Sequence, residues 1–314
     1  MNAFKILAPG GFTSVQDRGR FGYQQMGVPV SGALDSFAFT LANLLVGNHE
    51  NQAVLEITIM GPSLEIQKKM DIALTGARMG MFLNNNPVEQ WKSIRVKPGD
   101  ILTISQVQSG CRAYLAVGGG IKVPEVMGSY STYAGGKLGG FRGRPLEKGD
   151  ELTTHDTKLL DKQRSIPQNL IPQYPSNATI RAIPGPQDDY FNEGLTTLFA
   201  TEYMVTAKAD RMGYRLQGNA LPIRKDMPKS IISEPSMPGG IQIPPDEQPI
   251  ILLVEQTVGG YAKIATVIST DQSKVAQTTP GDMILFERTD LQTAHAVYME
   301  KINKIAKIKE LLWG

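Results

Sequence analysis

Asp17-Arg18-Gly19-Arg20-Phe21-Gly22-Tyr23, near the start of the chain, is matched in its second half by Asp210-Arg211-Met212-Gly213-Tyr214-Arg215. Each stretch follows an apolar segment that ends in a Pro-Gly turn, at Pro9-Gly10 and at Pro184-Gly185. Each half of the chain also ends on a Gly-Asp turn, at Gly149-Asp150 and at Gly281-Asp282. This repetition predicts two similar β-rich domains; the alternative is a chance match between common turn residues.

Short apolar runs separated by turn residues support a β-rich fold. Phe4–Leu7, Val54–Met60, Ile72–Leu74 and Arg112–Val117 each have the length of a strand, and Gly or Pro follows each run closely. Glycine supplies the positive φ that tight turns require. The sequence therefore predicts a mainly β fold with a few helices.

Three segments have helical periodicity. Ala33–Val46 carries apolar residues at i, i+3 and i+4 spacing and ends before Gly47. We also expect helices over Asp188–Ala200, where Gly194 weakens the prediction, and over Lys301–Trp313, which has one apolar stripe among lysines.

A polar segment with three prolines, within Thr154–Pro175, is the expected join between the two domains. We therefore predict a first domain over residues 1–165 and a second over residues 166–314.

Charge and composition exclude several classes of protein. The 314 residues include 32 Lys and Arg against 30 Asp and Glu, which gives no electrostatic basis for binding nucleic acid or an anionic membrane. The single cysteine excludes an internal disulfide, and the three histidines lie far apart, so we expect no metal site. The chain shows neither a signal-peptide core nor an apolar run of about 18–20 residues, which predicts a cytoplasmic protein.

Standard cofactor and nucleophile motifs are absent from the sequence. There is no Gly-x-Gly-x-x-Gly after a strand and no Gly-x-Ser-x-Gly. Gly135-Gly136-Lys137-Leu138 lacks the hydroxyl residue that would hold magnesium in a phosphate loop. No cofactor site is therefore evident in this chain.

The two repeated stretches concentrate polar side chains beside glycines. The first contains Gln16, Asp17, Arg20 and Tyr23, and the second contains Asp210, Arg211, Tyr214 and Arg215. Arginine binds carboxylate or phosphate at two points, and glycine allows close backbone approach. The alternative is an Asp–Arg pair that only holds a loop together.

Two later stretches add amide, carboxylate and ammonium groups. Glu234 precedes a Pro-Gly-Gly loop, and Gln242 then lies between two isoleucines, so its side chain faces either solvent or a pocket. Gln256, Thr257, Tyr261 and Lys263 surround a Gly-Gly loop that follows a strand. This loop is either part of a binding site or a plain hairpin turn. Together the four stretches suit a small polar ligand with a carboxylate or an amide.

Nine motifs lie in order along the chain: Gln16-Asp17-x-Gly19-Arg20-x-Gly22-Tyr23, Ser31-Gly32-Ala33-x-Asp35, Ala42-Asn43-x-Leu45-Val46-Gly47-Asn48, Leu55-Glu56, Ala113-Tyr114-Leu115-Ala116-Val117-x-Gly119-Gly120, Gly128-Ser129-x-Ser131-Thr132, Asp210-Arg211-Met212-Gly213-Tyr214-Arg215-Leu216, Gly240-Ile241-Gln242-Ile243-Pro244 and Gln256-Thr257-x-Gly259-Gly260-Tyr261. These motifs resemble the allophanate hydrolase subunit 2, or KipI-antagonist, family, whose members are mostly assigned as the C subunit of 5-oxoprolinase. They follow the family order over nearly the whole chain.

The resemblance implies two cyclophilin-like β-barrel domains. It also implies a complex with two further polypeptides, a KipI-like B subunit plus an A subunit, which together open 5-oxo-L-proline, a small cyclic amide, to L-glutamate with ATP as co-substrate. A fused relative forms half of the carboxyltransferase domain of biotin-dependent urea carboxylase. The alternatives are therefore a carboxyltransferase that uses carboxybiotin, and a non-catalytic antagonist that sequesters a kinase inhibitor.

Under the 5-oxoprolinase interpretation, the arginines would hold a carboxylate or phosphate, and the glutamines and a tyrosine would orient the lactam. The expected catalytic residues are Arg20, Arg211, Gln256 and Tyr261. The expected substrate-binding residues are Gln16, Asp17, Tyr23, Asp210, Tyr214, Arg215, Glu234, Gln242, Thr257 and Lys263. Because no ATP-binding loop is evident, we expect the nucleotide site to involve the B subunit or a cradle of backbone N–H groups.

Overall fold

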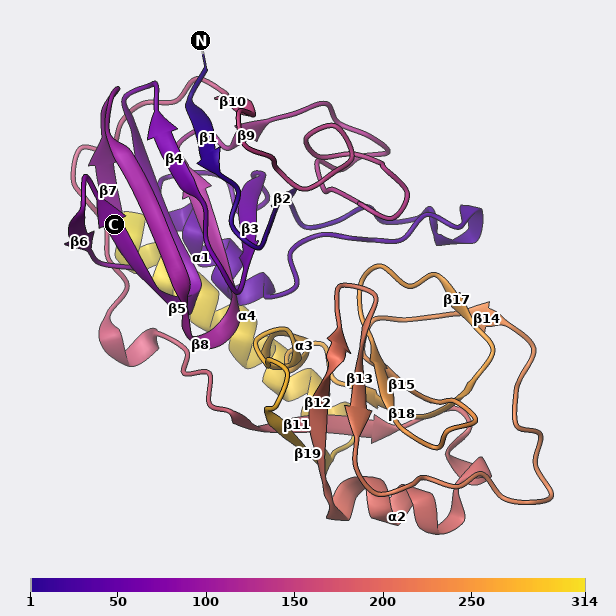
Figure 1. Cartoon of the computed structure of the whole chain (residues 1–314). Helices are drawn as coiled ribbons and strands as arrows, with labels where there is room; N and C mark the ends of the chain where they lie inside the picture. Colours follow the sequence, from indigo (N-terminus) through magenta and orange to yellow (C-terminus); the bar gives the residue numbers. More distant parts are fainter. Residues whose placement is uncertain (1, 314) are drawn as a thin grey trace. The chain divides into compact units, whose positions relative to one another are not determined.

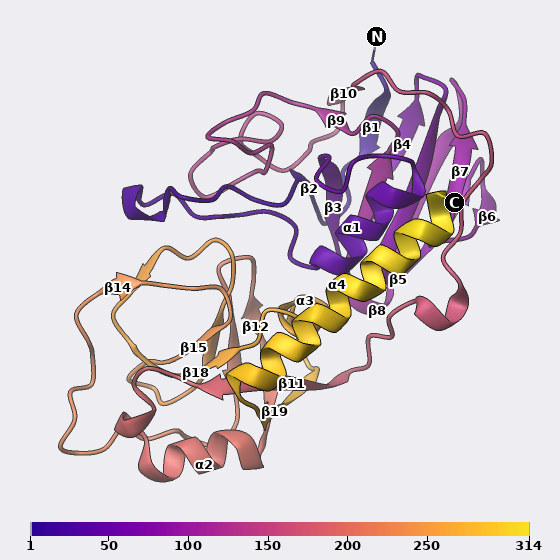
Figure 2. The same cartoon turned by 180° about the vertical axis from the view of Figure 1, so that it is seen from behind.

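The structure, a computed structural model, describes residues 2–313 and is drawn from opposite sides in Figures 1 and 2. Its backbone contacts divide the chain into two units. The first comprises Met1–Arg20, Ser31–Gln173 and Lys304–Gly314, and the second comprises Phe21–Val30 and Tyr174–Asn303. Within residues 2–313, none of the helices combines the length and the apolar character needed to cross a membrane.

The unit boundary lies close to the expected join, but neither unit is a single stretch of chain. The main change from the first unit to the second falls after Gln173, inside the expected join. Phe21–Val30 groups with the second unit, where the Gln24 side chain donates a hydrogen bond to the Ser236 carbonyl. The residues from Lys304 onward group with the first unit because this part of the helix packs there.

The first unit is built on a ten-stranded sheet with one main path of paired strands, β2-β3-β8-β4-β1-β10-β9. Strand β5 pairs with β8 and carries β6 and β7 on its other edge. The strands are β1 (Phe4–Ala8), β2 (Phe12–Gln16), β3 (Val54–Thr58), β4 (Ser63–Ile66), β5 (Met70–Leu83), β6 (Asn86–Val88), β7 (Ser93–Val96), β8 (Ile101–Val117), β9 (Ile121–Lys122) and β10 (Glu151–Thr154).

Both faces of the central strands are buried, which explains why their sequences are apolar without alternation. Along β5, Ile72 and Leu74 enter one apolar cluster, whereas Ala73 between them enters a second cluster on the opposite face. Along β8, Leu115 and its neighbour Tyr114 divide in the same way.

Helix α1 (Ser36–Leu45) supplies most of the second apolar cluster, and every residue from Phe37 to Leu45 is buried. The helix begins where the Asp35 carboxylate accepts hydrogen bonds from the Phe37 and Ala38 amides, which otherwise lack helical partners. A 3-10 turn, η2 (Gln168–Leu170), lies near the end of the unit's central segment.

The second unit contains a closed barrel in the order β11-β18-β15-β16-β13-β12-β19, and β19 pairs with β11 in parallel to complete it. A separate two-stranded ladder, β14-β17, lies beside the barrel (Figures 1 and 2). The strands are β11 (Asn177–Pro184), β12 (Glu202–Ala209), β13 (Gly213–Gln217), β14 (Glu234–Pro235), β15 (Gly240–Ile243), β16 (Ile250–Leu252), β17 (Val258–Gly259), β18 (Ala262–Val267) and β19 (Met283–Arg288). The mainly β prediction, with barrel-like domains, is confirmed.

Two short helices and two 3-10 turns accompany this barrel. They are α2 (Asn192–Ala200), α3 (Gln272–Val275), η1 (Gln24–Met26) and η3 (Asp188–Tyr190). The predicted helix over Asp188–Ala200 is therefore divided into η3 and α2. Helix α4 (Leu291–Trp313) begins well before the predicted Lys301 and contributes residues to both units.

Candidate functional site in the second unit

A bulge in the β15–β18 ladder places Gln242 opposite Lys263. The register passes from Ile241 opposite Ala265 to Gln242 opposite Lys263, so one residue of β18 is left over at this point. Bulges re-aim side chains, and directly opposed residues of an antiparallel pair lie on the same face. Gln242 and Lys263 therefore project from the sheet together, and both are buried.

The backbone of Lys263 is held from the other side by the segment after β11. Its amide donates to the Gln187 side-chain carbonyl at 3.0 Å, and its carbonyl accepts from the Gln187 amide at 3.3 Å. A Cβ on Gly185 would lie only 2.3 Å from the Lys263 carbonyl oxygen, so the close approach requires glycine. The position of Lys263 is thus fixed by its backbone as well as by its side chain.

The small β14–β17 ladder brings a carboxylate to this lysine. Glu234 lies opposite Gly259, and the Glu234 carboxylate forms an ion pair with the Lys263 ammonium. Ser236 follows on the same segment, where its amide donates to the Thr257 carbonyl at 2.9 Å. Glu234, Ser236, Gln242 and Lys263 therefore form one group, called here the polar cluster.

Two polar atoms of this cluster are buried without a hydrogen-bond partner in the part of the chain that the structure describes. They are the Ser236 hydroxyl and the Gln242 Nε2 amide nitrogen. Both approach Gly259, since a Cβ built there would lie 2.3 Å from Gln242 Nε2 and 3.1 Å from Ser236 Oγ. Buried donors are nearly always satisfied in folded proteins, so two such atoms side by side indicate a place for a ligand or water.

The cluster can supply three hydrogen-bond donors to one small acceptor. The Gln242 amide and the Ser236 hydroxyl are neutral donors, and the Lys263 ammonium adds a positive charge. An acceptor oxygen, from an amide carbonyl or a carboxylate, matches this set. Donors that are already in place and shielded from water interact strongly with negative charge that develops on such an oxygen.

Predicted residues of the following loop lie near the cluster in sequence but make local contacts. The Gln256 side chain donates to the Val258 carbonyl at 2.6 Å, and Tyr261 is partly exposed at 39%. The backbone carbonyl of Thr257 accepts the hydrogen bond from Ser236. The structure therefore brings Glu234, Gln242, Thr257 and Lys263 together in one place.

Arg211 holds the base of this loop. Its Nε donates to the Glu255 carboxylate at 2.6 Å, and the Glu255 amide donates back to the Arg211 carbonyl at 3.1 Å. Both side chains are more than nine-tenths buried. This pair fastens the turn between β12 and β13 to the chain that leads into β17.

The other predicted residues of this stretch have separate partners. The Asp210 carboxylate accepts from the amides of Met212 and Gly213, which closes the turn. Tyr214 is buried, and Arg215 pairs with Asp246 at 2.5 Å. None of these contacts joins the polar cluster.

Gln16, Asp17 and Arg20 are enclosed within the first unit. The Arg20 side chain has no exposed surface, and it donates to the backbone carbonyls of Val126 and Ser131 at 3.0 Å each. The structure thus shows Arg20 holding backbone carbonyls within the first unit, and the catalytic role expected for it stays a prediction. Without this side chain, the loop that contains Val126 and Ser131 would lose these two hydrogen bonds.

The neighbouring carboxylate and amide are held in the same way. The Asp17 carboxylate accepts from Gly19, Tyr130 and the hydroxyls of two serines, while Gln16 bonds to Ser14, Gly32 and Thr132. Tyr23, also predicted to bind substrate, belongs to the segment that groups with the second unit, and its carbonyl accepts from Met26 in η1.

Ser236 was missed as a site residue, although a signal for it was present. It lies two positions after Glu234, so in an extended segment both side chains point to the same face. Gln187 was missed because it acts through the backbone of a distant strand, which no local pattern indicates. Within residues 2–313, no group of three or more His, Cys, Asp or Glu side chains could hold a metal ion.

Comparison with known proteins now places the molecule in a family. A model of the carboxyltransferase domain, subdomain A and B, matches residues 26–288, and the chain belongs to this family.

Two curated relatives match over almost their whole length. The chain is 39% identical to the 5-oxoprolinase C subunit of Escherichia coli over 292 residues, which cover 92% of each protein. It is 34% identical to the 5-oxoprolinase C subunit of Haemophilus influenzae over 304 residues, 94% of this chain and 96% of that one. The crystal structure of the K. lactis urea amidolyase is similar with a TM-score of 0.92 and 35% identity, over 98% of this chain but only 20% of that one.

Proposed function

We propose that this chain is the C subunit of an ATP-dependent 5-oxoprolinase, which opens 5-oxo-L-proline to L-glutamate. The near-complete overlap with two proteins of that name carries the proposal, because the alignments cover 92% and 96% of those relatives. By contrast, the chain spans only 20% of the similar urea amidolyase.

The chemistry explains why such a reaction needs ATP. A lactam is an amide, and its resonance makes the carbonyl carbon a poor electrophile. Transfer of the γ-phosphoryl group to the lactam oxygen, with release of ADP, converts that oxygen into a leaving group. Water then adds to the carbon and the C–N bond breaks, so the nitrogen leaves as the amine and an acyl phosphate remains. A second water hydrolyses this acyl phosphate to L-glutamate and inorganic phosphate.

The polar cluster suits the recognition of such a substrate. Gln242 Nε2 and Ser236 Oγ lack partners in the described structure and can donate to a lactam or carboxylate oxygen, while Lys263 supplies a positive charge beside them. We assign substrate binding to these side chains, with Gln256, Thr257 and Tyr261 on the adjoining loop. Arg211 fastens that loop through Glu255 and acts as a positioning residue.

Other subunits of the complex contribute to the nucleotide site in this proposal. We propose that a KipI-like B subunit shares the nucleotide site and that the enzyme is completed by an A subunit. The absence of a phosphate-loop motif from the sequence supports a shared nucleotide site. Purified chain alone is then expected not to turn over 5-oxoproline with ATP.

The test is to co-express the three polypeptides of the complex and to measure ATP-dependent release of glutamate from 5-oxoproline. Gln242→Leu removes the unpartnered amide at similar volume, so the complex should assemble and lose activity by about tenfold or more. Gln217→Leu is the matched control, since Gln217 is an exposed glutamine of the same barrel. Equal activity in the two variants would remove Gln242 from the site.

A carboxyltransferase function is the second candidate, because the family model and the urea amidolyase structure both favour it. The same donors would then orient carboxybiotin or an acceptor amide, with biotin carried by another protein. Transfer of carboxyl from a carboxylated biotin carrier to urea, in a complex that releases no glutamate from 5-oxoproline, would establish this alternative.

A further inference from the structure

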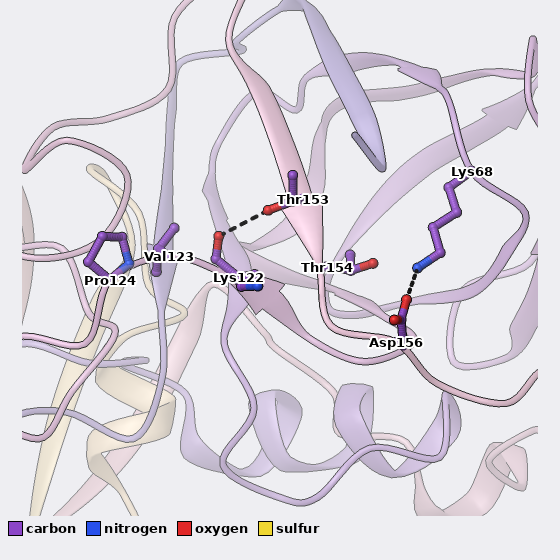
Figure 3. A pocket seen from close by; sticks show the side chains of 7 residues that line it. All are labelled: Lys68, Lys122, Val123, Pro124, Thr153, Thr154 and Asp156. Atoms are coloured by element: carbon purple, nitrogen blue, oxygen red, sulfur yellow. Dashed lines mark hydrogen bonds and ion pairs between the residues drawn. The ribbon is translucent and has the colours of Figure 1, made fainter. Parts of the chain in front are cut away.

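A separate hollow of about 730 Å³ lies in the first unit, beside β9 and β10 (Figure 3). Its polar lining consists of Lys68, Lys122, Thr153, Thr154 and Asp156. Val123 and Pro124 complete the wall with apolar surface. None of these residues belongs to the polar cluster, and the family motifs quoted above do not include them.

The charges around this hollow favour an anion. Two lysines and only one carboxylate line the hollow, and the Lys68 ammonium pairs with the Asp156 carboxylate at 3.1 Å. Because the Asp156 side chain is wholly exposed, water screens this pair and an incoming anion can replace the carboxylate at low cost. The Lys122 ammonium is exposed and makes no ion pair with any residue that the structure describes.

A buried hydroxyl adds an independent indication of a ligand. Thr154 is only 8% exposed, and its Oγ1 has no hydrogen-bond partner among residues 2–313. Figure 3 shows this hydroxyl pointing to the side of the hollow on which Lys68 and Asp156 lie. An unpaired hydroxyl destabilises a folded chain unless a ligand or water binds it.

We propose that this hollow binds a small organic anion through a carboxylate or phosphate group. The oxygens of the anion accept from Lys122 and Thr154 and displace Asp156 from Lys68, while the rest of the molecule lies against Val123 and Pro124. The site is distinct from the polar cluster, and the proposal does not depend on the 5-oxoprolinase function.

Titration calorimetry of the full-length chain with inorganic phosphate and, separately, with L-glutamate tests this site. At least one anion should bind with millimolar or tighter affinity, and the one that binds identifies the group recognised. Lys122→Gln should weaken binding about two- to fivefold, and added salt should weaken it further. Lys69→Gln is the matched control, because Lys69 is an exposed neighbouring lysine that does not line the hollow.

Two further variants give effects that a purely structural role would not produce. Thr154→Val should weaken binding about tenfold while leaving the free chain as stable as before or more stable. Asp156→Asn should tighten binding about two- to fivefold, because it removes the competing carboxylate. The proposal is overturned if neither anion binds the wild-type chain, or if Lys122→Gln or Thr154→Val binds as well as wild type.

Discussion

The ammonium of Lys263 binds the carboxylate of Glu234, yet 8% of the lysine side chain is exposed against 42% of the glutamate side chain. The lysine of this pair is therefore buried, whereas the glutamate side chain reaches solvent. A lysine in this position depends on its partner, since an uncompensated buried charge is costly.

We predict that Glu234→Gln lowers the free energy of unfolding by about 1–2 kcal/mol, because Lys263 loses its counter-charge while the exposed side of the pair limits the loss. Urea denaturation measures the change. Asp226→Asn is the control, since it removes a carboxylate from an exposed pair with Arg224 and should change stability little. Equal losses in the two variants would contradict the importance of burial at Lys263.

Gly259→Ala should abolish most of the complex's activity while the second unit stays folded. The new Cβ would lie 2.3 Å from Gln242 Nε2, and the amide must move to accommodate it. Gly260→Ala is a neighbouring control, because its Cβ would meet other atoms no closer than 3.3 Å. Circular dichroism checks the fold and glutamate release checks the activity. A fully active Gly259→Ala complex would argue against the cluster as the substrate site.

The Arg211–Glu255 pair offers a double-mutant test. Arg211→Met and Glu255→Leu should each destabilise the chain by about 3 kcal/mol or more, because each leaves one buried charge without its partner. The double variant should lose much less than the sum. If activity returns together with stability in the double variant, Arg211 is a positioning residue. A stable but inactive double variant would instead give Arg211 the catalytic role expected from the sequence.

Acid should weaken the second unit through Asp271. Burial by itself raises the pKa of this carboxyl, but hydrogen bonds from the Arg181 side chain and amide outweigh it and hold the pKa below its ordinary value. The stabilisation is therefore present above about pH 4 and is lost as the pH falls through the lowered pKa of the folded state.

Asp271→Asn should remove this dependence. Wild type should exceed the variant in free energy of unfolding at about pH 6, and the difference should narrow toward about pH 3. Denaturant titrations across this range measure it. A difference that stays constant, or grows, as the pH falls would contradict the role of the Arg181–Asp271 pair.

The strands and helices were largely predictable because local patterns specify them. The helix that begins after Asp35 has a cap and an apolar stripe that both appear in the sequence. The first part of α4 was missed, because exposed residues such as Leu291 and Tyr298 give no clear stripe for burial. The predicted strand Arg112–Val117 is only the last part of the longer strand β8, since the polar residues before it continue the ladder.

The candidate site was only partly predictable. Gln242 and Lys263 carried visible signals, because Gln242 lies between two isoleucines and Lys263 follows a Gly-Gly loop. Their pairing depends on a bulge in the register, which the sequence does not reveal. The sequence predicts that Arg20 binds a ligand, because the N–H donors of a guanidinium suit anions. The same donors also suit backbone carbonyls, and in the structure they bind two of them.

The order in which the chain is synthesised has a consequence for the first unit. Ile308, on helix α4, is packed in the apolar cluster to which α1 contributes most residues. The first unit therefore includes residues that are synthesised after the whole second barrel. Domains usually fold one after another as they leave the ribosome. Here the earliest-made unit must wait, with the hydrophobic surface beside α1 uncovered, until the last turns of α4 emerge.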